Sequence, residues 1–470
     1  MNKFCARALL ALTVGVALQS VQARDPFTLD VTVDGNRNRM FGFANVEQAI
    51  DQLDVDRLGQ ELQYGGTESV LVAIDFRGLG IDLSFADSSN ALVFAIPGLN
   101  FNATPDQERQ ESSDQKVFQG ASRKESLEQL KDYLKENKAA LKALLTRLAQ
   151  VSPIDPLAGN PLSLMSQTQA RNFAHGFTHK VSQVYGCSTP AFNRQGNVQL
   201  AARDEGWALG CGIPVMVARA GDGGDLFREA QDRAAALRGE NEIGIGLSYQ
   251  STTADVAGGS YKSSSVNLPL SYTAKFNADP RKKFRIDIPL SYTDAEGAKS
   301  YSVGLGFAYT HPISDVWTLT PAVGAGVTGS EDLGSAGGVV SYSIASAYSW
   351  RIGDWGLSMG NMVGKYDSLG LTLGDIEAEA DISSTAFVNG LLLSGPGSLL
   401  ARDMVIEYHI TDTRLTGDEV YAEHYDEAGV SVGWIKQRHG VITRYLKAGV
   451  SYLTGDRDIS GYKLNLALRF

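Results

Sequence analysis

The chain has 470 residues, of which 43% are hydrophobic, and it carries a formal net charge of -11 with a mean hydropathy of -0.13. This length exceeds one ordinary hydrophobic core, so we expect two domains. The mean hydropathy argues against a membrane protein built from apolar helices. The acidic balance argues against a nucleic-acid partner, because phosphate binding needs a basic face.

Residues 1–23 have the features of a secretory signal peptide. Lys3 and Arg7 precede an apolar run over Ala8–Leu18, and the small residues Val21 and Ala23 suit cleavage after residue 23. The apolar run is shorter than the about 20 residues that a transmembrane helix needs. We therefore expect the mature chain to be exported.

Two cysteines, Cys187 and Cys211, follow the predicted signal peptide. In an oxidising compartment they suit one disulfide, which would stabilise the fold by about 3 kcal/mol. Two buried free thiols are the alternative. Nothing near them has the spacing of a metal cluster, so no metal or cofactor is expected.

Residues 24–223 predict a mixed α and β domain. The expected strands are 27–33, 68–76, 80–85 and 91–96. The apolar run in the second of these suits a strand that is buried on both faces. A polar linker over 102–116 follows the strands.

A long amphipathic helix is predicted between Ser122, which suits an N-cap, and Pro153, which suits a stop. Its leucines recur every three or four residues, which indicates core packing, with a partner helix or a membrane surface as the alternatives. His175 and His179 follow it at a spacing that a metal could bridge. No third ligand is marked, so two surface histidines are expected.

Residues 241–470 follow one pattern, in which apolar and polar residues alternate over segments separated by Gly, Asp, Ser and Pro. The first segment is "NEIGIGLSYQ" (241–250) and the last is "GYKLNLALRF" (461–470). The pattern predicts twelve strands, within two, of an antiparallel transmembrane β-barrel. If the first strand runs outward, the short turns near 311–315 and 352–354 are periplasmic, and the long acidic loops 366–381 and 412–422 are extracellular.

The two faces of these strands differ in a way that suits a barrel in lipid. One face is small or weakly polar and carries isolated charges, which predicts that it faces the lumen. The predicted lumen-facing charges are Arg285, Asp287, Glu407, Lys447, Lys463 and Arg469. The apolar face ends in rings, and the predicted aromatic girdle is Tyr249, Tyr272, Tyr292, Tyr309 and Tyr452.

The last segment places Tyr462, Leu464, Leu466, Leu468 and Phe470 on one face. A barrel has no free edge, so this strand is expected to pair with the first, near 243–249. A terminal Phe on such a strand also resembles the signal that the outer-membrane barrel assembly machinery reads. The predicted partners are therefore that machinery and the outer-membrane lipids, and the barrel is expected to be a monomer.

Residues 241–470 resemble the translocator barrel of an autotransporter, and the chain is more similar to the solitary barrels of that family, which have no recognised passenger, than to those with a classical passenger. In this resemblance a helix occupies the pore, and residues 224–240 are the candidate; a plain inter-domain helix is the alternative. The implied protein is an outer-membrane barrel of a Gram-negative bacterium that anchors or displays its N-terminal region. The alternative is a channel or structural barrel with a periplasmic accessory domain.

No enzyme is predicted. Some outer-membrane phospholipases have twelve strands and a Ser/His/Asn site on the lipid face, whereas His409 falls on the polar face of its strand. No Ser–His pair is specified by spacing. The sequence therefore predicts no catalytic residue.

Overall fold

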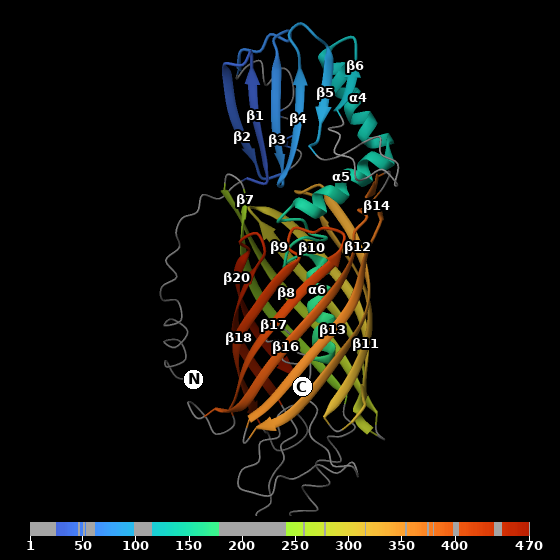
Figure 1. The fold of residues 1–470 in the computed structure, drawn as a ribbon, viewed down its shortest axis with the longest axis vertical. Helices are drawn as coiled ribbons and strands as arrows, with labels where there is room; N and C mark the ends of the chain where they lie inside the picture. Colours follow the sequence, from blue (N-terminus) through green and yellow to red (C-terminus); the bar gives the residue numbers. More distant parts are fainter. Residues whose placement is uncertain are drawn as a thin grey trace, which may run out of the picture.

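The computed structural model describes residues 25–45, 48–49, 52, 62–97, 115–177, 241–256, 259–276, 279–314, 316–352, 355–373, 376–378, 380–397, 404–436 and 444–469. Within them lie a six-stranded sheet, three helices and a closed antiparallel barrel of twelve strands (Figure 1). The predicted barrel and its strand number are confirmed. None of the described helices combines the length and the apolar character needed to cross a membrane.

The N-terminal sheet has the strand order β2-β1-β3-β4-β5-β6, and every pairing in it is antiparallel. Its strands are β1 (Phe27–Val33), β2 (Arg37–Phe43), β3 (Val70–Phe76), β4 (Leu79–Phe85), β5 (Ala91–Ala95) and β6 (Gln115–Gln119). Alternate residues of β1 are fully buried, as its period of two requires. The prediction that β3 is buried on both faces is wrong, because Leu71 is exposed on the open face of the sheet.

Two helices, α4 (Arg123–Glu136) and α5 (Lys138–Val151), stand where one long helix was expected. Ser122 caps the first as predicted, and its hydroxyl accepts a hydrogen bond from the amide of Glu125 at 3.2 Å. The break falls at Asn137, which leaves the helical conformation and caps α5 through a 3.0 Å bond from the amide of Ala140. The leucine faces of both helices pack against the sheet.

The barrel strands are β7 (Glu242–Val256), β8 (Gly259–Phe276), β9 (Asp279–Ala295), β10 (Ala298–Pro312), β11 (Trp317–Ser330), β12 (Ser335–Ile352), β13 (Trp355–Leu369), β16 (Ser383–Gly397), β17 (Met404–Gly417), β18 (His424–Lys436), β19 (Arg444–Gly455) and β20 (Ser460–Arg469). The ring closes where β20 pairs with β7, with Leu464 opposite Tyr249 and Leu468 opposite Ile245. This is the predicted closure. A short hairpin of β14 (Leu371–Leu373) and β15 (Ile376–Ala378) lies in the connection after β13.

The barrel has two distinct ends. β7 begins and β20 ends at the same end, which we call the terminal end, and the hairpin connections of β7 to β8 and of β19 to β20 lie at the other, which we call the loop end. The N-terminal sheet with α4 and α5 sits on the loop end (Figure 1). There Lys142 of α5 pairs with Asp381 at 3.1 Å, and Tyr261 and Leu333 of the barrel join the core of the sheet.

The neck segment, residues 152–163, leads from α5 into the mouth of the barrel and is buried throughout. Asp155 organises it by accepting hydrogen bonds from the amides of Leu157 and Ala158, at 2.9 and 3.2 Å. Its other carboxylate oxygen lies 3.6 Å from Arg77, a fully buried residue in the turn between β3 and β4. Burial raises the pKa of Asp155, although the Arg77 guanidinium opposes that shift. Sheet, neck and barrel thus share one closed interface.

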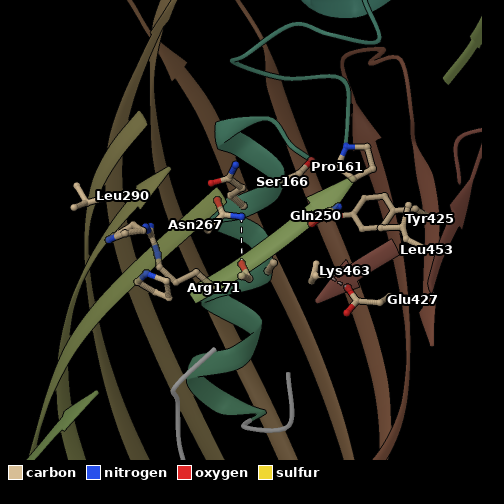
Figure 2. A pocket seen from close by; sticks show the side chains of 15 residues that line it. Pro161, Ser166, Arg171, Gln250, Asn267, Leu290, Tyr425, Glu427, Leu453 and Lys463 are labelled. Atoms are coloured by element: carbon tan, nitrogen blue, oxygen red, sulfur yellow. Dashed lines mark hydrogen bonds and ion pairs between the residues drawn. The ribbon is translucent and has the colours of Figure 1, made fainter. Parts of the chain in front are cut away.

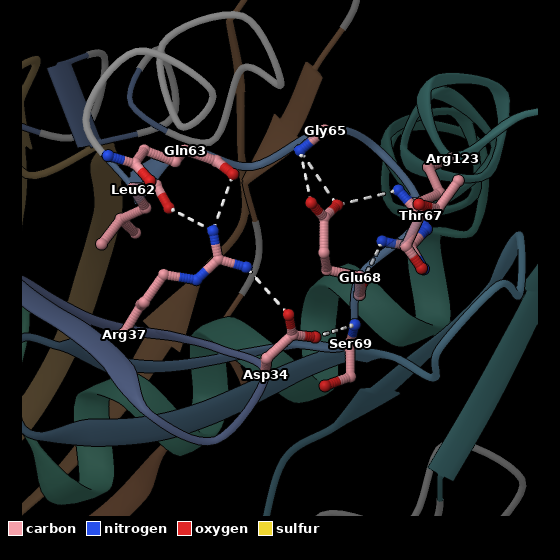
Figure 3. A network of polar contacts seen from close by, with 9 residues as sticks. All are labelled: Asp34, Arg37, Leu62, Gln63, Gly65, Thr67, Glu68, Ser69 and Arg123. Carbon is pink, nitrogen blue, oxygen red and sulfur yellow. Dashed lines mark hydrogen bonds and ion pairs between the residues drawn. The ribbon is translucent and has the colours of Figure 1, made fainter.

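Arg123, the first residue of α4, fastens the helix to the loops of the sheet (Figure 3). The side chain is buried, so its hydrogen bonds replace water. Its guanidinium donates to the hydroxyl of Tyr64 and to the carbonyl oxygens of Thr67, Glu68, Ala86 and Ser89, at distances between 2.5 and 2.9 Å.

Replacing this guanidinium should loosen the sheet. We expect Arg123→Met to lower the stability of β3–β5 by about 3 kcal/mol, because the substitution leaves several buried carbonyl oxygens without a donor. Amide hydrogen exchange of these strands in the full chain measures the effect. Lys124→Met, at the exposed neighbouring position, is the control and should leave the exchange unchanged. Equal exchange in both variants would contradict the role of Arg123.

Glu68 folds the loop before β3 around its own carboxylate, which accepts hydrogen bonds from the amides of Gly65 and Thr67 at 2.9 and 3.1 Å (Figure 3). Hydrogen bonds from backbone amides, its own first and then that of Gly65, lower the pKa of Glu68. The fold therefore favours the ionised form. The resulting stability is present at neutral pH and is lost as the pH falls through the lowered pKa.

The direction of this pH dependence can be tested with the variant Glu68→Gln. At neutral pH we expect the amides of Gly65 and Thr67 to exchange faster in the variant than in the wild type. The difference should shrink as the pH falls below the usual range of a glutamate, because the wild-type carboxylate then becomes protonated. A difference that stays constant with pH would show that the charge of Glu68 is irrelevant to this loop.

Candidate functional site in the barrel lumen

The lumen of the barrel is occupied by α6 (Leu164–Gly176). The hydroxyl of Ser163 caps the helix and bonds the carbonyl oxygen of Asn160 at 2.7 Å, which ties the first turn to the neck segment. α6 begins at the loop end and runs toward the terminal end (Figure 1). It packs chiefly against β10–β13.

Glycines on the lumen wall make room for the side chains of α6. A Cβ at Gly324 of β11 would lie 2.7 Å from one terminal nitrogen of Arg171, and a Cβ at Gly304 of β10 would lie 3.0 Å from the other. A Cβ at Gly390 of β16 would likewise lie 3.0 Å from the ring of Phe173. These positions need glycine because the helix approaches the wall this closely.

Asp287 of β9 is the electrostatic anchor of α6. Its carboxylate lies 3.2 Å from Nε of Arg171 and contacts Nε2 of His175, one turn further along the helix. Nε of Arg285, on the same strand, lies 3.8 Å from the Asp287 carboxylate. All four side chains are buried, so the electrostatic interactions among them are little screened by water.

Neutral hydrogen bonds fix the helix on other sides. Asn172 donates to the hydroxyls of Ser341 and Tyr366, at 3.2 and 3.4 Å. The hydroxyl of Tyr425, on β18, lies 3.5 Å from the side-chain oxygen of Gln169. Because these partners lie on strands around the ring, α6 is held in one rotation and at one depth.

The wall formed by β17–β20 carries its own ion pairs. Lys447 contacts Glu407, and Lys463 donates to Glu427 at 2.8 Å. His409 lies 3.5 Å from Glu427. Each glutamate is therefore paired with a lysine two strands further along the ring, which permits charged groups inside it.

A cavity of about 80 Å³ remains between α6 and the part of the wall formed by β18–β20 and β7–β9 (Figure 2). Polar groups surround it, among them Ser166 and Arg171 of α6 and Gln250, Asn267, Tyr425 and Lys463 of the barrel. A space of this size and polarity suits a few water molecules.

The predicted lumen-facing charges are distributed over both walls. Arg285 and Asp287 lie beside α6, whereas Glu407, Lys447 and Lys463 lie on the opposite wall. All five are inside the ring. The side chain of Arg469 lies outside the described residues.

The predicted girdle tyrosines are all on the outward face. Tyr249, Tyr292 and Tyr452 lie toward the loop end, and the next outward residue of each strand, two positions further on, is polar. Tyr272 and Tyr309 lie nearer the terminal end. Neighbouring rings associate across strands, with centroids 6.2 Å apart for Tyr249 and Tyr462. Leu464, Leu466 and Leu468 also point outward and are exposed.

Several predictions fall outside the described residues. They concern the signal peptide (1–23), the cysteines Cys187 and Cys211, the candidate pore helix 224–240, His179 and Phe470. Within the described part of the chain, the helix in the lumen is α6, which the sequence analysis did not identify as a helix.

The prediction that His175 is a surface residue is wrong. It is 4% exposed and lies against Asp287 inside the barrel. The signal for α6 was present in "SLMSQTQARNFAHGF" (163–177), where a serine cap precedes a stretch without helix breakers. Most of the α6 surface is buried and carries polar as well as apolar residues, so its sequence has no periodic leucine stripe to mark it as a helix.

Neutralising Asp287 should loosen α6. We expect Asp287→Asn to raise amide exchange across 164–176 by about tenfold or more, because Arg171 loses the carboxylate that pairs with it inside the ring. The full chain is measured, with exchange of β10–β13 as the internal reference. Glu407→Gln, which alters an ion pair on the opposite wall, is the matched control. An α6 that exchanges equally slowly in both variants would contradict the anchoring role.

No protein-family profile matches the sequence, and no curated protein matches it. Among solved structures, the chain is similar to the translocator domain of the autotransporter NalP from Neisseria meningitidis, at 12% identity and a TM-score of 0.40, over 52% of this chain and 96% of that one. The β domain of the Bordetella autotransporter BrkA gives 12% identity and a TM-score of 0.39, over 49% and 98%. A FadL homologue from Pseudomonas aeruginosa gives 8% identity and 0.31, over 50% and 91%. Identities of this size carry no residue roles from these proteins to this chain.

Proposed function

We propose that the chain is an outer-membrane barrel that anchors its N-terminal sheet and displays it at the cell surface. The observation that carries this proposal is the path of the chain. The sheet lies at the loop end, α6 passes through the lumen, and β7 starts from the terminal end. α6 therefore runs from the end that carries the sheet toward the end where β7 begins.

The outer surface of the barrel supports a membrane location. Apolar side chains cover it and are exposed although the ring is closed. In lipid, a closed barrel satisfies every backbone group while such side chains replace contact with water. The exposed apolar side chains include Ile243, Leu247, Leu268, Leu290, Val303, Leu305, Val323, Ile344, Val363, Leu391, Leu464, Leu466 and Leu468.

The connections support an orientation with the loop end outside the cell. The longest connection in the described barrel, between β13 and β16, lies at the loop end and carries the extra β14–β15 hairpin. Barrels of this kind place short turns in the periplasm and longer loops outside. In this orientation both ends of the barrel domain lie in the periplasm, where its assembly machinery is the expected partner.

In the same proposal α6 closes the pore. The neck segment fills the mouth at the loop end, and α6 fits the wall glycines and pairs with Asp287. The role that the resemblance gave to residues 224–240 passes to α6. We propose no catalytic role for this site, whose charged groups are used to hold a helix.

The second candidate is a channel with a periplasmic accessory domain. The polar cavity beside α6 is the observation that favours it. The two candidates place the sheet on opposite sides of the membrane, so the location of the sheet distinguishes them.

An epitope tag inserted at Gly35 tests the location. Gly35 lies in the turn between β1 and β2, and there is open space around it. We expect antibody to label this tag on intact cells. The control is the same tag at Ser314, in the turn between β10 and β11 at the terminal end, which should be labelled only after the outer membrane is permeabilised.

The opposite pattern, with Ser314 labelled and Gly35 protected on intact cells, would overturn display and favour the channel. Both tagged chains should sediment with outer membranes. They should also migrate differently on SDS gels before and after boiling, as a folded barrel does. Recovery of the chain in the soluble fraction would refute the membrane location itself.

A further inference from the structure

A pair of carboxamides interrupts the apolar outer surface of the barrel. Asn361 of β13 and Asn389 of β16 lie directly opposite each other, and Nδ2 of Asn361 donates to Oδ1 of Asn389 at 2.6 Å. Both side chains point outward and are exposed. Among the described residues, no other side-chain hydrogen bond engages either amide.

Apolar side chains lie on both sides of the pair along the strands. Met359 pairs with Leu391 in the row toward the terminal end, and Val363 pairs with Phe387 in the row toward the loop end. All four are between 40% and 45% exposed, so they form the same outer surface as the pair. The amides thus lie within the apolar belt, one row from its edge at the loop end.

The polar neighbours in the same row are already engaged. Ser346 of β12 accepts a hydrogen bond from the indole of Trp317 at 2.8 Å. The carboxylate of Asp412, on β17, lies 3.0 Å from Nε2 of His424 and 3.3 Å from Nε of Arg414. The Asn361–Asn389 pair therefore retains one carbonyl oxygen and one amino group to offer outward.

We infer that the outer face of β13 and β16 binds a second copy of this chain, in place of the monomer expected from the sequence. This inference rests on the proposed membrane location. In lipid, an unsatisfied amide is costly, because hydrocarbon supplies no hydrogen-bond partner. A partner that supplies one donor and one acceptor at this depth removes that cost.

A second copy supplies these groups by symmetry. Two barrels in one membrane that face each other across a two-fold axis along the membrane normal bring the Asn361–Asn389 pair of one opposite the same pair of the other at the same depth. The free amino group of one pair then meets the free carbonyl oxygen of the other, twice. Turning both amides over exchanges donor and acceptor but keeps this complementarity. The four apolar side chains around the pair would pack against those of the partner and exclude water from the hydrogen bonds.

Cross-linking in native outer membranes tests the contact. Leu391→Cys places a thiol beside the pair, and Leu247→Cys, on β7, places one on the opposite side of the ring. With a homobifunctional maleimide we expect at least tenfold more dimer from Leu391→Cys than from Leu247→Cys. The unmodified chain, treated in the same way, corrects for its own cysteines.

A second variant tests whether the two amides are needed for the dimer, or whether cross-links form only because two barrels come close together. Asn361→Leu with Asn389→Leu, added to Leu391→Cys, should lower the dimer yield at least tenfold, while the shift on SDS gels shows that the barrel still folds. Equal yields from both reporter positions, or a yield unaffected by the two leucines, would overturn the inference. Cross-links to a different protein or to lipid would overturn it as well. A chain absent from the membrane fraction would instead refute the location on which the inference rests.

Discussion

The structure depends on one constraint, which is that a ring of twelve strands encloses more space than its own side chains fill. An eight-stranded barrel is filled by its residues, and much larger barrels hold a water channel. Here the chain resolves the intermediate case with a helix and a matching wall. Glycines stand at 304 and 324 because Arg171 is large, and contacts with Arg171 and His175 offset part of the cost of burying Asp287. The residues of the wall and those of α6 therefore match each other in size and in charge.

The same segment that fills the lumen also carries the sheet. The neck segment runs from α5 to α6 without an exposed residue, and Arg77 of the sheet pairs with Asp155 inside it. Two buried charges are a poor source of stability compared with apolar packing, but they fix geometry, since a displaced partner would leave a bare charge in an apolar interface. The sheet is consequently not a freely tethered domain. Its position over the barrel mouth and the depth of α6 in the lumen are set together.

The barrel was predictable from the sequence because each of its strands alternates with a period of two over ten or more residues. The outward face was equally clear, since Leu464, Leu466 and Leu468 have no other environment that suits them. α6 was not predictable in this way. Periodicity detects a helix that has one apolar side, whereas α6 buries polar and charged side chains such as Gln169, Arg171 and Asn172 as well as its apolar ones. The partners of His175 and Arg171 lie more than a hundred residues away in sequence, and no local pattern connects them.

The order in which these parts can assemble follows from the topology. The ring closes through β20, the last described strand, whereas the sheet, the neck segment and α6 all precede β7 in the chain. If the ring closed first, α6 would have to enter a finished lumen with a folded sheet attached at one end. If α6 is already in place when β20 pairs with β7, no part of the chain has to pass through a closed ring. Asp287 can then pair with Arg171 of α6 before the ring closes. The second route is the simpler one, because it needs no passage of the sheet through the ring. On this route, ring closure also depends on the glycines of the wall. Larger side chains at these positions would hold α6 away from Asp287 before the last strand pairs.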